Sequence, residues 1–475
     1  MHVTCYLKSM RSYLVAALLL SAVTASAQLP ADTETKIAAI ANDTLKQTGV
    51  PSASVAVAVD GKLAYAQAFG LANVAPAKPA TAQMAYPIGS ISKQFTATAL
   101  LLLQQQGKLS LDDKVSKYFP ELTRANEVSL RNLMTMTSGY EDFAPQDYII
   151  PDWYKQIAPL ANVHVWAGKP LDFTPGTDWQ YSNTNYVLLG LVVEKVSGKP
   201  LYQFLRENLF TPLHLDGVFN TYTQREKLEV TGYVSNAMAP VRVLPLEAPG
   251  WYFGDGDLSM PASTLVAWDL GIMQQKLLTP ASYKQFETAF VFPSGPKSGQ
   301  SSNYGLGIFV QDRNGHRMIE HGGEVGGYVS ENIVFPDDKI AVVVLTNEVA
   351  SSAASKIGAE VAKLLDSGIV APVVPDTLAA SLKTILTGMQ TSQIDRSLFT
   401  SNCNAYFDAN TLADFQSTLA PLGAITDVKR TRTNLRGGMT FGAYQVTFAN
   451  GTRLSISTYL KPDGKIEQLL ITGKA

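Results

Sequence analysis

Ser90 and Lys93 are the residues of this sequence whose types and spacing best suit nucleophilic chemistry. A free hydroxyl is a poor nucleophile near neutral pH, so a reactive serine needs a base beside it. The spacing Ser-x-x-Lys places both side chains on one face of a helix, whose N-terminus favours negative charge on the serine oxygen. The same spacing recurs at residues 294–297, but the inner glycine and proline disfavour a helix there. Because an ammonium is not a base, Lys93 must be buried or lie near other cations to lose its proton readily.

The tripeptide Tyr181-Ser182-Asn183, just before a helical pattern over 186–196, is the second candidate element. A tyrosine next to a lysine can carry protons between the serine and a leaving group. Asn183 can hydrogen-bond both the lysine and an amide of a substrate. Taken alone, the tripeptide suits a helix cap equally well, since Ser and Asn favour that position.

A third element, His321-Gly322-Gly323-Glu324, lies between two strand patterns and is followed by residues 325–327, Val-Gly-Gly. Glycines in a strand mark a place where another group approaches the backbone closely, here a substrate along the strand edge. A bulge or turn is the alternative explanation. The backbone N–H groups of Ser90 and Glu324 are the candidates for an oxyanion hole.

In this order and at these intervals, the three elements resemble those of the serine β-lactamase and penicillin-binding-protein superfamily. The resemblance is to the class C β-lactamase-like group, with its DD-peptidases, D-aminopeptidases and esterases. It extends from about Lys36 to Leu365 and implies that Ser90 is the acylated nucleophile, with Lys93 and Tyr181 as the acid/base pair. Four further motifs support it, namely Pro87-Ile88-Gly89, Leu133-Met134-Thr135-Met136-Thr137-Ser138-Gly139, Pro175-Gly176 and Gly256-Asp257-Leu258-Ser259.

The resemblance also implies that Asn183 positions the substrate and that His321 and Gly323 form the strand motif facing it. Many β-lactamases have Lys, then Thr or Ser, then Gly at this motif. Here His321 replaces a permanent cation with a group that titrates near neutrality, and Gly322 lacks the hydroxyl that binds a substrate carboxylate. We therefore expect an acyl-enzyme hydrolase of D-amino-acid peptides, related amides or small esters. A class C-like β-lactamase and a penicillin-binding or sensing protein with little turnover are the alternatives.

The hydrophobic patterns predict an α+β fold, in which an antiparallel sheet is flanked by helices and joined to a mainly helical region over about 109–275. Both ends of the resembling segment contribute strands, expected at 52–59, 63–69, 304–310, 317–321, 328–335 and 339–346. Helices are expected at 32–47, 90–107, 186–196, 264–273 and 350–365. We expect the loop 140–159 and the segment 251–253 to shape the pocket.

The chain divides into a predicted signal peptide at 1–27, a hydrolase domain at 28–368, a linker at 369–376 and a small α+β accessory domain at 377–475. Translation could begin at Met1 or Met10. By pattern alone, the accessory domain resembles a cystatin-like or nuclear-transport-factor-2-like fold. It could cover the active-site mouth, bind cell wall, pair subunits or only stabilise the chain. The signal peptide predicts a secreted or periplasmic protein without a membrane span after cleavage.

Charge and cysteine content limit the partners. A net charge of −2 with 16% charged residues gives no attraction for nucleic acid. Cys5 lies in the predicted signal, so Cys403 has no internal disulfide partner. The five histidines have no metal-ligand spacing. We therefore expect no cofactor and no metal, and a small-molecule or peptide substrate, with cell-wall peptides among the candidates; the sequence does not predict the oligomeric state.

Overall fold

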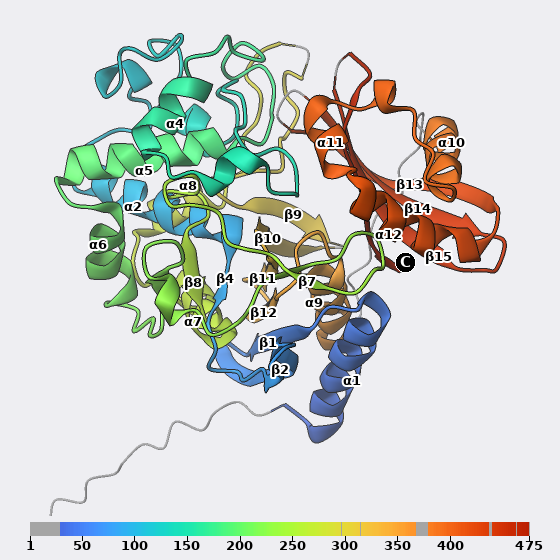
Figure 1. Ribbon diagram of the computed structural model, residues 1–475. Helices are drawn as coiled ribbons and strands as arrows, with labels where there is room; N and C mark the ends of the chain where they lie inside the picture. Colours follow the sequence, from blue (N-terminus) through green and yellow to red (C-terminus); the bar gives the residue numbers. More distant parts are fainter. Residues whose placement is uncertain are drawn as a thin grey trace, which may run out of the picture.

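The computed structural model describes residues 29–295, 297–313, 315–366, 379–436, 439–461 and 463–474. The predicted signal peptide at 1–27 and the predicted linker at 369–376 lie outside these residues. Figure 1 shows an antiparallel sheet with helices on both sides, and a second sheet with its own helices beside it. The predicted α+β fold, including a small C-terminal module with a β-sheet, is confirmed.

The main sheet has seven strands in the order β3-β2-β1-β12-β11-β10-β9, and every pairing in it is antiparallel. Asp60 and Gly61, both at positive φ, turn the chain between the first two strands. The central pair joins Ala53 to Thr346, so the two ends of the hydrolase segment meet in one sheet. The strands are β1 (Ser52–Val59), β2 (Lys62–Asn73), β3 (Lys78–Pro79), β9 (Phe309–Arg313), β10 (His316–Val325), β11 (Tyr328–Phe335) and β12 (Ile340–Thr346).

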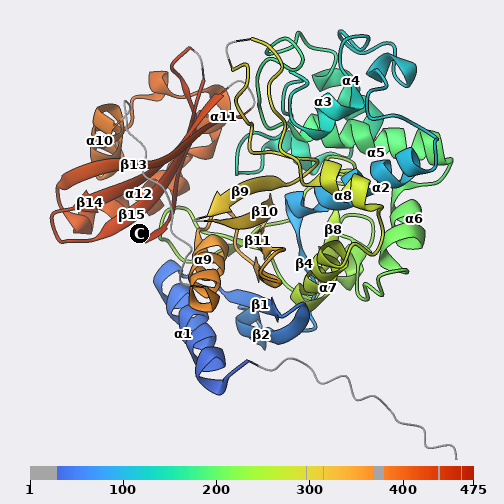
Figure 2. The ribbon, with the colours of Figure 1, turned by 180° about the vertical axis from the view of Figure 1, so that it is seen from behind.

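Both faces of the main sheet are covered (Figures 1 and 2). On one face, α1 (Ala31–Thr48) and α9 (Ala353–Leu365) bury a cluster of aliphatic residues. On the other face, α7 (Ala262–Met273) packs on β1 and β12. Since the central strands are buried on both faces, β1 and β12 are almost continuously apolar rather than alternating.

Beyond α7 lies the mainly helical region, in which α2 packs against α5. Its helices are α2 (Lys93–Gln105), α3 (Leu130–Met134), α4 (Pro159–Trp166), α5 (Asn183–Ser197), α6 (Leu201–Leu205) and α8 (Pro280–Phe286). Short strands also occur there, namely β4 (Tyr86–Pro87), β5 (Phe219–Asn220), β6 (Tyr233–Val234), β7 (Arg242–Val243) and β8 (Leu258–Met260). Together, β4, β8 and β5 form a small sheet directly before the turn that holds Ser90.

The C-terminal module has its own apolar core, which includes Cys403. Its four strands form a meander in the order β13-β14-β15-β16, and three helices precede them. The elements are α10 (Ala379–Met389), α11 (Ser401–Tyr406), α12 (Ala409–Leu419), β13 (Ile425–Arg436), β14 (Met439–Phe448), β15 (Arg453–Leu460) and β16 (Ile466–Lys474). The resemblance of this module to a cystatin-like fold stays a prediction.

One predicted strand is displaced. We expected it at 304–310, whereas β9 begins at Phe309 and ends at Arg313. The chain turns instead at Gly305, whose N–H donates to the Ile308 carbonyl, and at Gly307, which has a φ of 82° and lies against the Lys93 carbonyl. Apolar residues over 304–308 are therefore core residues in a turn. Within the described residues, no helix combines the length and the apolar character needed to cross a membrane.

Candidate active site

Ser90 lies in a 3₁₀ turn, Gly89–Ser92, between β4 and the first turn of α2. The preceding Gly89 has a φ of 50°, and a Cβ there would lie 2.6 Å from the backbone nitrogen of Glu324. Glycine is therefore required at 89, because the serine turn is pressed against β10. This contact brings the two predicted oxyanion-hole residues, Ser90 and Glu324, to the same place.

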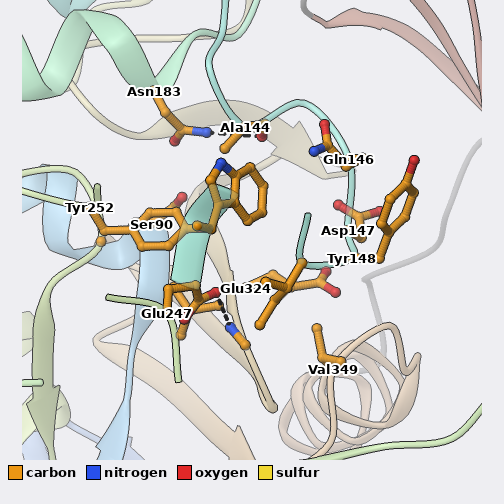
Figure 3. A pocket seen from close by; sticks show the side chains of 15 residues that line it. Ser90, Ala144, Gln146, Asp147, Tyr148, Asn183, Glu247, Tyr252, Glu324 and Val349 are labelled. Carbon is orange, nitrogen blue, oxygen red and sulfur yellow. Dashed lines mark hydrogen bonds between the residues drawn. The ribbon is translucent and has the colours of Figure 1, made fainter. Parts of the chain in front are cut away.

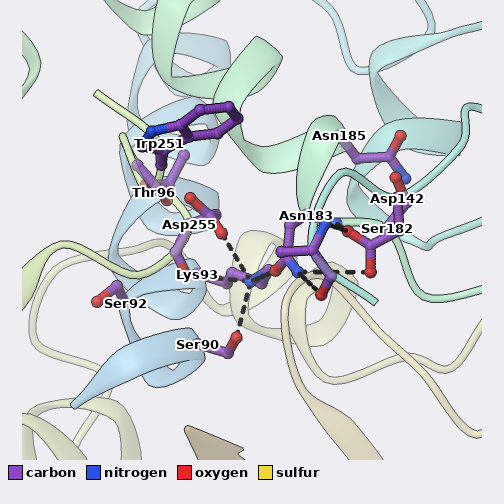
Figure 4. Close-up of polar contacts among 12 residues, drawn as sticks. Ser90, Ser92, Lys93, Thr96, Asp142, Ser182, Asn183, Asn185, Trp251 and Asp255 are labelled. Carbon is purple, nitrogen blue, oxygen red and sulfur yellow. Dashed lines mark hydrogen bonds and ion pairs between the residues drawn. The ribbon is translucent and has the colours of Figure 1, made fainter. Parts of the chain in front are cut away.

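Lys93 is fully buried and holds the centre of the site (Figure 4). Its Nζ donates hydrogen bonds to Ser90 Oγ (2.9 Å), Asn183 Oδ1 (2.7 Å) and the carbonyl oxygen of Asp255 (3.0 Å). Three acceptors around one nitrogen is the arrangement of an ammonium group, which has three protons to donate. The predicted pairing of Lys93 with both Ser90 and Asn183 is thus present in the geometry.

A buried carboxylate, absent from our sequence-based candidates, faces the same lysine. Asp255 Oδ2 lies 3.6 Å from Lys93 Nζ, and both side chains are almost completely excluded from solvent. Burial raises the pKa of the Asp255 carboxyl to about 8, and the neighbouring lysine opposes this effect. The loop is fixed to α2, because Thr96 donates to the Gly254 carbonyl at 2.6 Å. Lys93 is therefore buried, as the sequence suggested, and it faces a carboxyl group rather than another cation.

Asn183 is oriented by a second aspartate that we did not identify in the sequence. Asp142 Oδ1 accepts from the Asn183 backbone N–H at 2.9 Å, and Asp142 Oδ2 accepts from the side-chain amide at 3.4 Å. The amide also donates to the Ala144 carbonyl at 3.3 Å. With its NH₂ group bound in this way, Asn183 directs its oxygen towards Lys93 (Figure 4).

Tyr181 is largely buried beside Lys93. Its ring centroid lies 5.0 Å from Lys93 Nζ, and the rings of Tyr304 and His321 lie 6.3 Å and 6.0 Å from it. The two halves of the predicted acid/base pair, separated in the sequence by a long helical region, are therefore neighbours in the fold. Tyr181 and Ser90 also line one cavity.

The segment His321–Glu324 lies on a strand edge that faces the serine turn. Strand β9 pairs with β10 only as far as Glu320, so the edge beyond it has no strand partner on that side among the residues that the structure describes. At Gly323, a Cβ would lie 1.9 Å from the Ile88 carbonyl oxygen and 2.4 Å from Ser330 Oγ. The close approach that we attributed to a substrate is at this position made by the protein itself.

His321 is buried rather than presented to solvent. Its Nδ1 lies 2.6 Å from the Gly322 carbonyl oxygen, which can only accept, and its Nε2 lies 3.0 Å from the Tyr304 hydroxyl. The Nδ1 position must therefore carry the proton, and in the neutral ring Nε2 accepts from Tyr304. Both ring nitrogens of His321 are therefore hydrogen-bonded within the protein.

Ser90 is also part of a small pocket of about 30 Å³, which we call the acyl pocket (Figure 3). The long loop contributes much of its wall, and Tyr252 contributes from the second expected segment, as predicted; Trp251 and Phe253 are not among the lining residues. The wall consists of Ser90, Ala144, Gln146, Asp147, Tyr148, Ile149, Trp153, Asn183, Glu247, Tyr252, Gly256, Glu324, Val325, Gly326 and Val349.

A larger cavity of about 520 Å³ begins at Ser90 and Tyr181, passes the β10 edge and continues to the C-terminal module. We call it the module cleft. From the hydrolase segment it is lined by His321, Glu320 and Glu331, among others. The module contributes Thr431, Arg432, Phe441, Ala443, Tyr444, Gln445, Ser455, Ile456, Ser457, Tyr459 and Thr472.

One group of side chains could offer ligands to a metal ion, away from Ser90. His316, Asp338 and Asp366 place their ligand atoms within 4.8 Å of one another, at the opposite end of β10. The His316 ring lies 3.0 Å from the Asp338 carboxylate, and this hydrogen bond raises the pKa of the histidine. This arrangement is that of a surface ion pair. It contributes nothing to the site around Lys93.

Comparison with known proteins agrees with this geometry. A stretch of 321 residues, 64% of this chain and 70% of the relative, is 28% identical to penicillin-binding protein 4* from Bacillus subtilis (strain 168). A D-stereospecific amidohydrolase from Streptomyces sp. has a similar solved structure, with a TM-score of 0.58 and 27% identity over 68% of this chain and 96% of that one.

A second solved structure is similar over nearly the whole chain. The octameric penicillin-binding protein homologue from Pyrococcus abyssi has a TM-score of 0.62 and 21% identity, over 93% of this chain and 99% of that one. The family model described as Beta-lactamase matches residues 37–366, the segment that carries the serine turn, the buried lysine and the open strand edge. This chain belongs to the Beta-lactamase family.

Proposed function

We propose that the protein is an exported serine hydrolase that forms an acyl-enzyme on Ser90. The observation that carries this proposal is the buried Lys93, whose Nζ donates to Ser90 Oγ at 2.9 Å while the ring of Tyr181 lies 5.0 Å away. A lysine buried in a protein core is rare unless it is paired or used. Here it is hydrogen-bonded to Ser90 Oγ, and Ser90 lines both cavities.

In the proposed acylation, Ser90 Oγ attacks the substrate carbonyl carbon and its proton enters the Lys93–Tyr181 pair. The carbonyl oxygen becomes an oxyanion held by the backbone N–H groups of Ser90 and Glu324. As the bond to the leaving group breaks, Tyr181 delivers a proton to the departing nitrogen or oxygen. Water then attacks the acyl-enzyme, and the same pair takes its proton and returns one to Ser90.

For the substrate we propose D-amino-acid peptides, related amides or small esters. The Streptomyces relative, a D-stereospecific amidohydrolase, supports the amide class. Efficient β-lactam hydrolysis is disfavoured, because His321 is buried with both ring nitrogens hydrogen-bonded within the protein and Gly322 has no hydroxyl for a substrate carboxylate. Rapid turnover of nitrocefin would contradict this assignment.

The test is covalent labelling followed by intact-mass detection. A fluorophosphonate and a panel of p-nitrophenyl esters, D-aminoacyl anilides and D-Ala-D-Ala peptides are each mixed with the purified protein. We expect a mass increase equal to the acyl or phosphonyl group, located on Ser90 by peptide mapping, and its loss in Ser90→Ala. Labelling that persists in Ser90→Ala would refute the nucleophile assignment. Export is tested separately by the mature N-terminus, expected at Gln28.

A further inference from the structure

Ser90 lies where the acyl pocket and the module cleft meet, and these two spaces can be assigned to the two halves of a substrate. Both cavities include Ser90, but only the module cleft is lined by Tyr181 and only the acyl pocket is lined by Asn183. The atom that leaves must be next to the acid that protonates it. With Tyr181 as that acid, the leaving group extends into the module cleft and the acyl group occupies the acyl pocket.

The acyl pocket is far smaller than the module cleft, about 30 Å³ against about 520 Å³. Its walls are tied together, since the Ala248 N–H donates to the Trp153 carbonyl and the Trp251 indole N–H donates to the Lys155 carbonyl. A space with room for only about two water molecules can take a short acyl group without rearrangement. An acyl group of several residues has no room there.

The charged residues that line the same pocket are all acidic, and the nearby cation Lys93 lies behind Ser90 and Asn183. Asp147, Glu247 and Glu324 are all part of its wall, and among its described lining residues there is no lysine, arginine or histidine (Figure 3). Acidic residues confined to a pocket next to the nucleophile favour a cation as ligand. An amino acid with a free α-amino group has its ammonium two bonds from the carbonyl carbon that Ser90 attacks, which suits a pocket of this size.

Glu247 is the carboxylate best placed to bind such a cation. It is buried, and Glu247 Oε1 accepts from the Gly326 N–H at 2.8 Å while Oε2 lies 3.4 Å from the Tyr222 hydroxyl. These two donors fix the carboxylate in the pocket wall but bring no positive charge. Burial raises the pKa of the Glu247 carboxyl, and an ammonium ligand would stabilise its anionic form. The Arg225 guanidinium donates to the Glu247 backbone carbonyl at 2.8 Å.

We propose that this site releases single amino acids with a free α-ammonium group from amides, esters or the amino termini of peptides, and that Glu247 binds the ammonium. The inference rests on the proposed function, because it takes Ser90 as the nucleophile and Tyr181 as the acid. The rest of the substrate lies in the module cleft. The enzyme therefore cleaves after the first residue of its substrate, as an aminopeptidase or amino-acid amidase does. It does not remove the last residue, as a carboxypeptidase does.

The first test needs no mutation. The purified full-length protein is given D-alanine p-nitroanilide, N-acetyl-D-alanine p-nitroanilide and propionic acid p-nitroanilide, which share one leaving group and differ in the amine. The L-alanine compound is run in parallel. We expect kcat/KM for the free amine to exceed that for the acetylated and the propionyl compounds by at least about tenfold, because both lack the buried charge pair.

The second test uses Glu247→Gln, which keeps the shape of the side chain and removes its charge. We expect kcat/KM for D-alanine p-nitroanilide to fall at least about tenfold, mainly through KM, and to fall more than kcat/KM for p-nitrophenyl propionate, which has no ammonium group. Glu348→Gln is the matched control, since Glu348 is also buried but is not part of the acyl pocket wall. Far-UV circular dichroism and thermal unfolding establish that both variants are folded.

The possible outcomes separate the two levels of the proposal. If no substrate, including p-nitrophenyl propionate, acylates Ser90, the proposed function itself fails. If Ser90 is acylated but the acetylated substrate is as good as the free amine, only the ammonium assignment is overturned. If a folded Glu247→Gln variant still prefers the free amine, another group binds the ammonium. That result would contradict the role of Glu247.

Discussion

Lys93 contacts Ser90, Tyr181, Asn183 and Asp255, and its three hydrogen bonds do not suit a role as the first base. Its donors are directed at Ser90, Asn183 and Asp255, and the carboxylate of Asp255 lies 3.6 Å from the same nitrogen. An ammonium that is held in this way stabilises negative charge on neighbouring oxygens. Proton transfer from Ser90 then depends on a second group in contact with the lysine, for which Tyr181 is the candidate.

We expect Tyr181→Phe to lower kcat for the preferred substrate by at least about a hundredfold, the usual scale for loss of a general acid or base. The ring contacts with Tyr304 and His321 remain, so the thermal unfolding midpoint should stay close to that of the wild type. Stopped-flow measurement of acylation and intact-mass analysis report the chemical step directly. Wild-type kcat in a folded Tyr181→Phe protein would remove the phenol from the mechanism.

The sequence identified Ser90, Lys93 and Tyr181 but missed Asp142 and Asp255, and the reason is physical. Spacing on a helix makes a serine and a lysine three residues apart visible as a pair. A single aspartate in a loop has no periodic signal. Its importance depends on a partner that the fold supplies, as when Asp255 meets Lys93 from 162 residues away.

At the scale of elements, two adjacent glycines in β10 differ in how closely other atoms approach them. A Cβ at Gly323 would lie 1.9 Å from the Ile88 carbonyl oxygen, whereas the nearest atom to a Cβ at Gly322 would be 3.5 Å away. Both glycines line the module cleft, but only Gly323 also holds the strand edge against the serine turn. The sequence motif showed both glycines but could not separate these roles.

We therefore expect Gly323→Ala to lower the free energy of unfolding by about 1–3 kcal/mol, the scale of overpacking in a core. It should also lower activity, because Ser90 and Glu324 would move apart. Gly322→Ala should change stability by at most about 0.5 kcal/mol. Urea unfolding of the two variants measures the difference, and equal stability would contradict the packing shown at Gly323.

Glu348, at the end of β12, gives a prediction about pH. Burial raises the pKa of its carboxyl to about 7, and Ser235 donates to one of its oxygens. An unfolded glutamate ionises at a pH near 4, so between about pH 4 and pH 7 the unfolded state gains charge before the folded state does. This carboxyl thus lowers the free energy of unfolding as the pH rises through that window, by at most roughly 4 kcal/mol.

We expect Glu348→Gln to abolish this decline, because an amide does not ionise. The stability of the variant relative to the wild type should then increase from pH 5 to pH 8, as measured by urea unfolding at each pH. The quantity to compare is the change with pH in the free energy of unfolding of the variant relative to the wild type. The buried amide also alters this free energy, but by an amount that does not depend on pH. A relative stability that is the same at both pH values would place the pKa of Glu348 in its ordinary range.

The positions of strands and helices could be predicted from the sequence where buried residues recur at regular intervals. Both β1 and β12 are short apolar runs with clear turns, and α9 has one buried stripe, so their positions were predicted closely. The displaced strand β9 shows the limit of this method. Apolar residues over 304–308 bury their side chains in a turn that lies against the Lys93 carbonyl. The position of this turn depends on α2, a helix about two hundred residues earlier in the sequence.

For the whole molecule, the C-terminal module is joined to the loop that forms the acyl pocket. The Asp147 N–H donates to Gln468 Oε1 at 2.6 Å, and Gln468 Nε2 donates back to Asp147 Oδ2 at 2.8 Å. The adjacent Tyr148 donates to the Glu467 carbonyl at 2.9 Å, and its ring stacks on Tyr406. Through these contacts, the module can position a wall of the site as well as line the module cleft.

We expect Gln468→Ala to lower kcat/KM by about tenfold, because the loop around Asp147 loses two of its fixed contacts. The control is Arg242→Ala, which breaks an ion pair between β7 and Asp414 of the module at a surface away from both cavities. Such a surface pair is worth at most about 1 kcal/mol. If both variants keep wild-type kinetics, the module does not position the acyl pocket.

The pairing of β1 with β12 affects how the protein folds. Ala53 must find Thr346 before the main sheet can close, and the edge of β10 reaches the serine turn only as part of that sheet. Pairing across such a distance closes a long loop, which makes folding slow. The chain therefore contains its nucleophile, Ser90, long before the strand that completes the main sheet has been made.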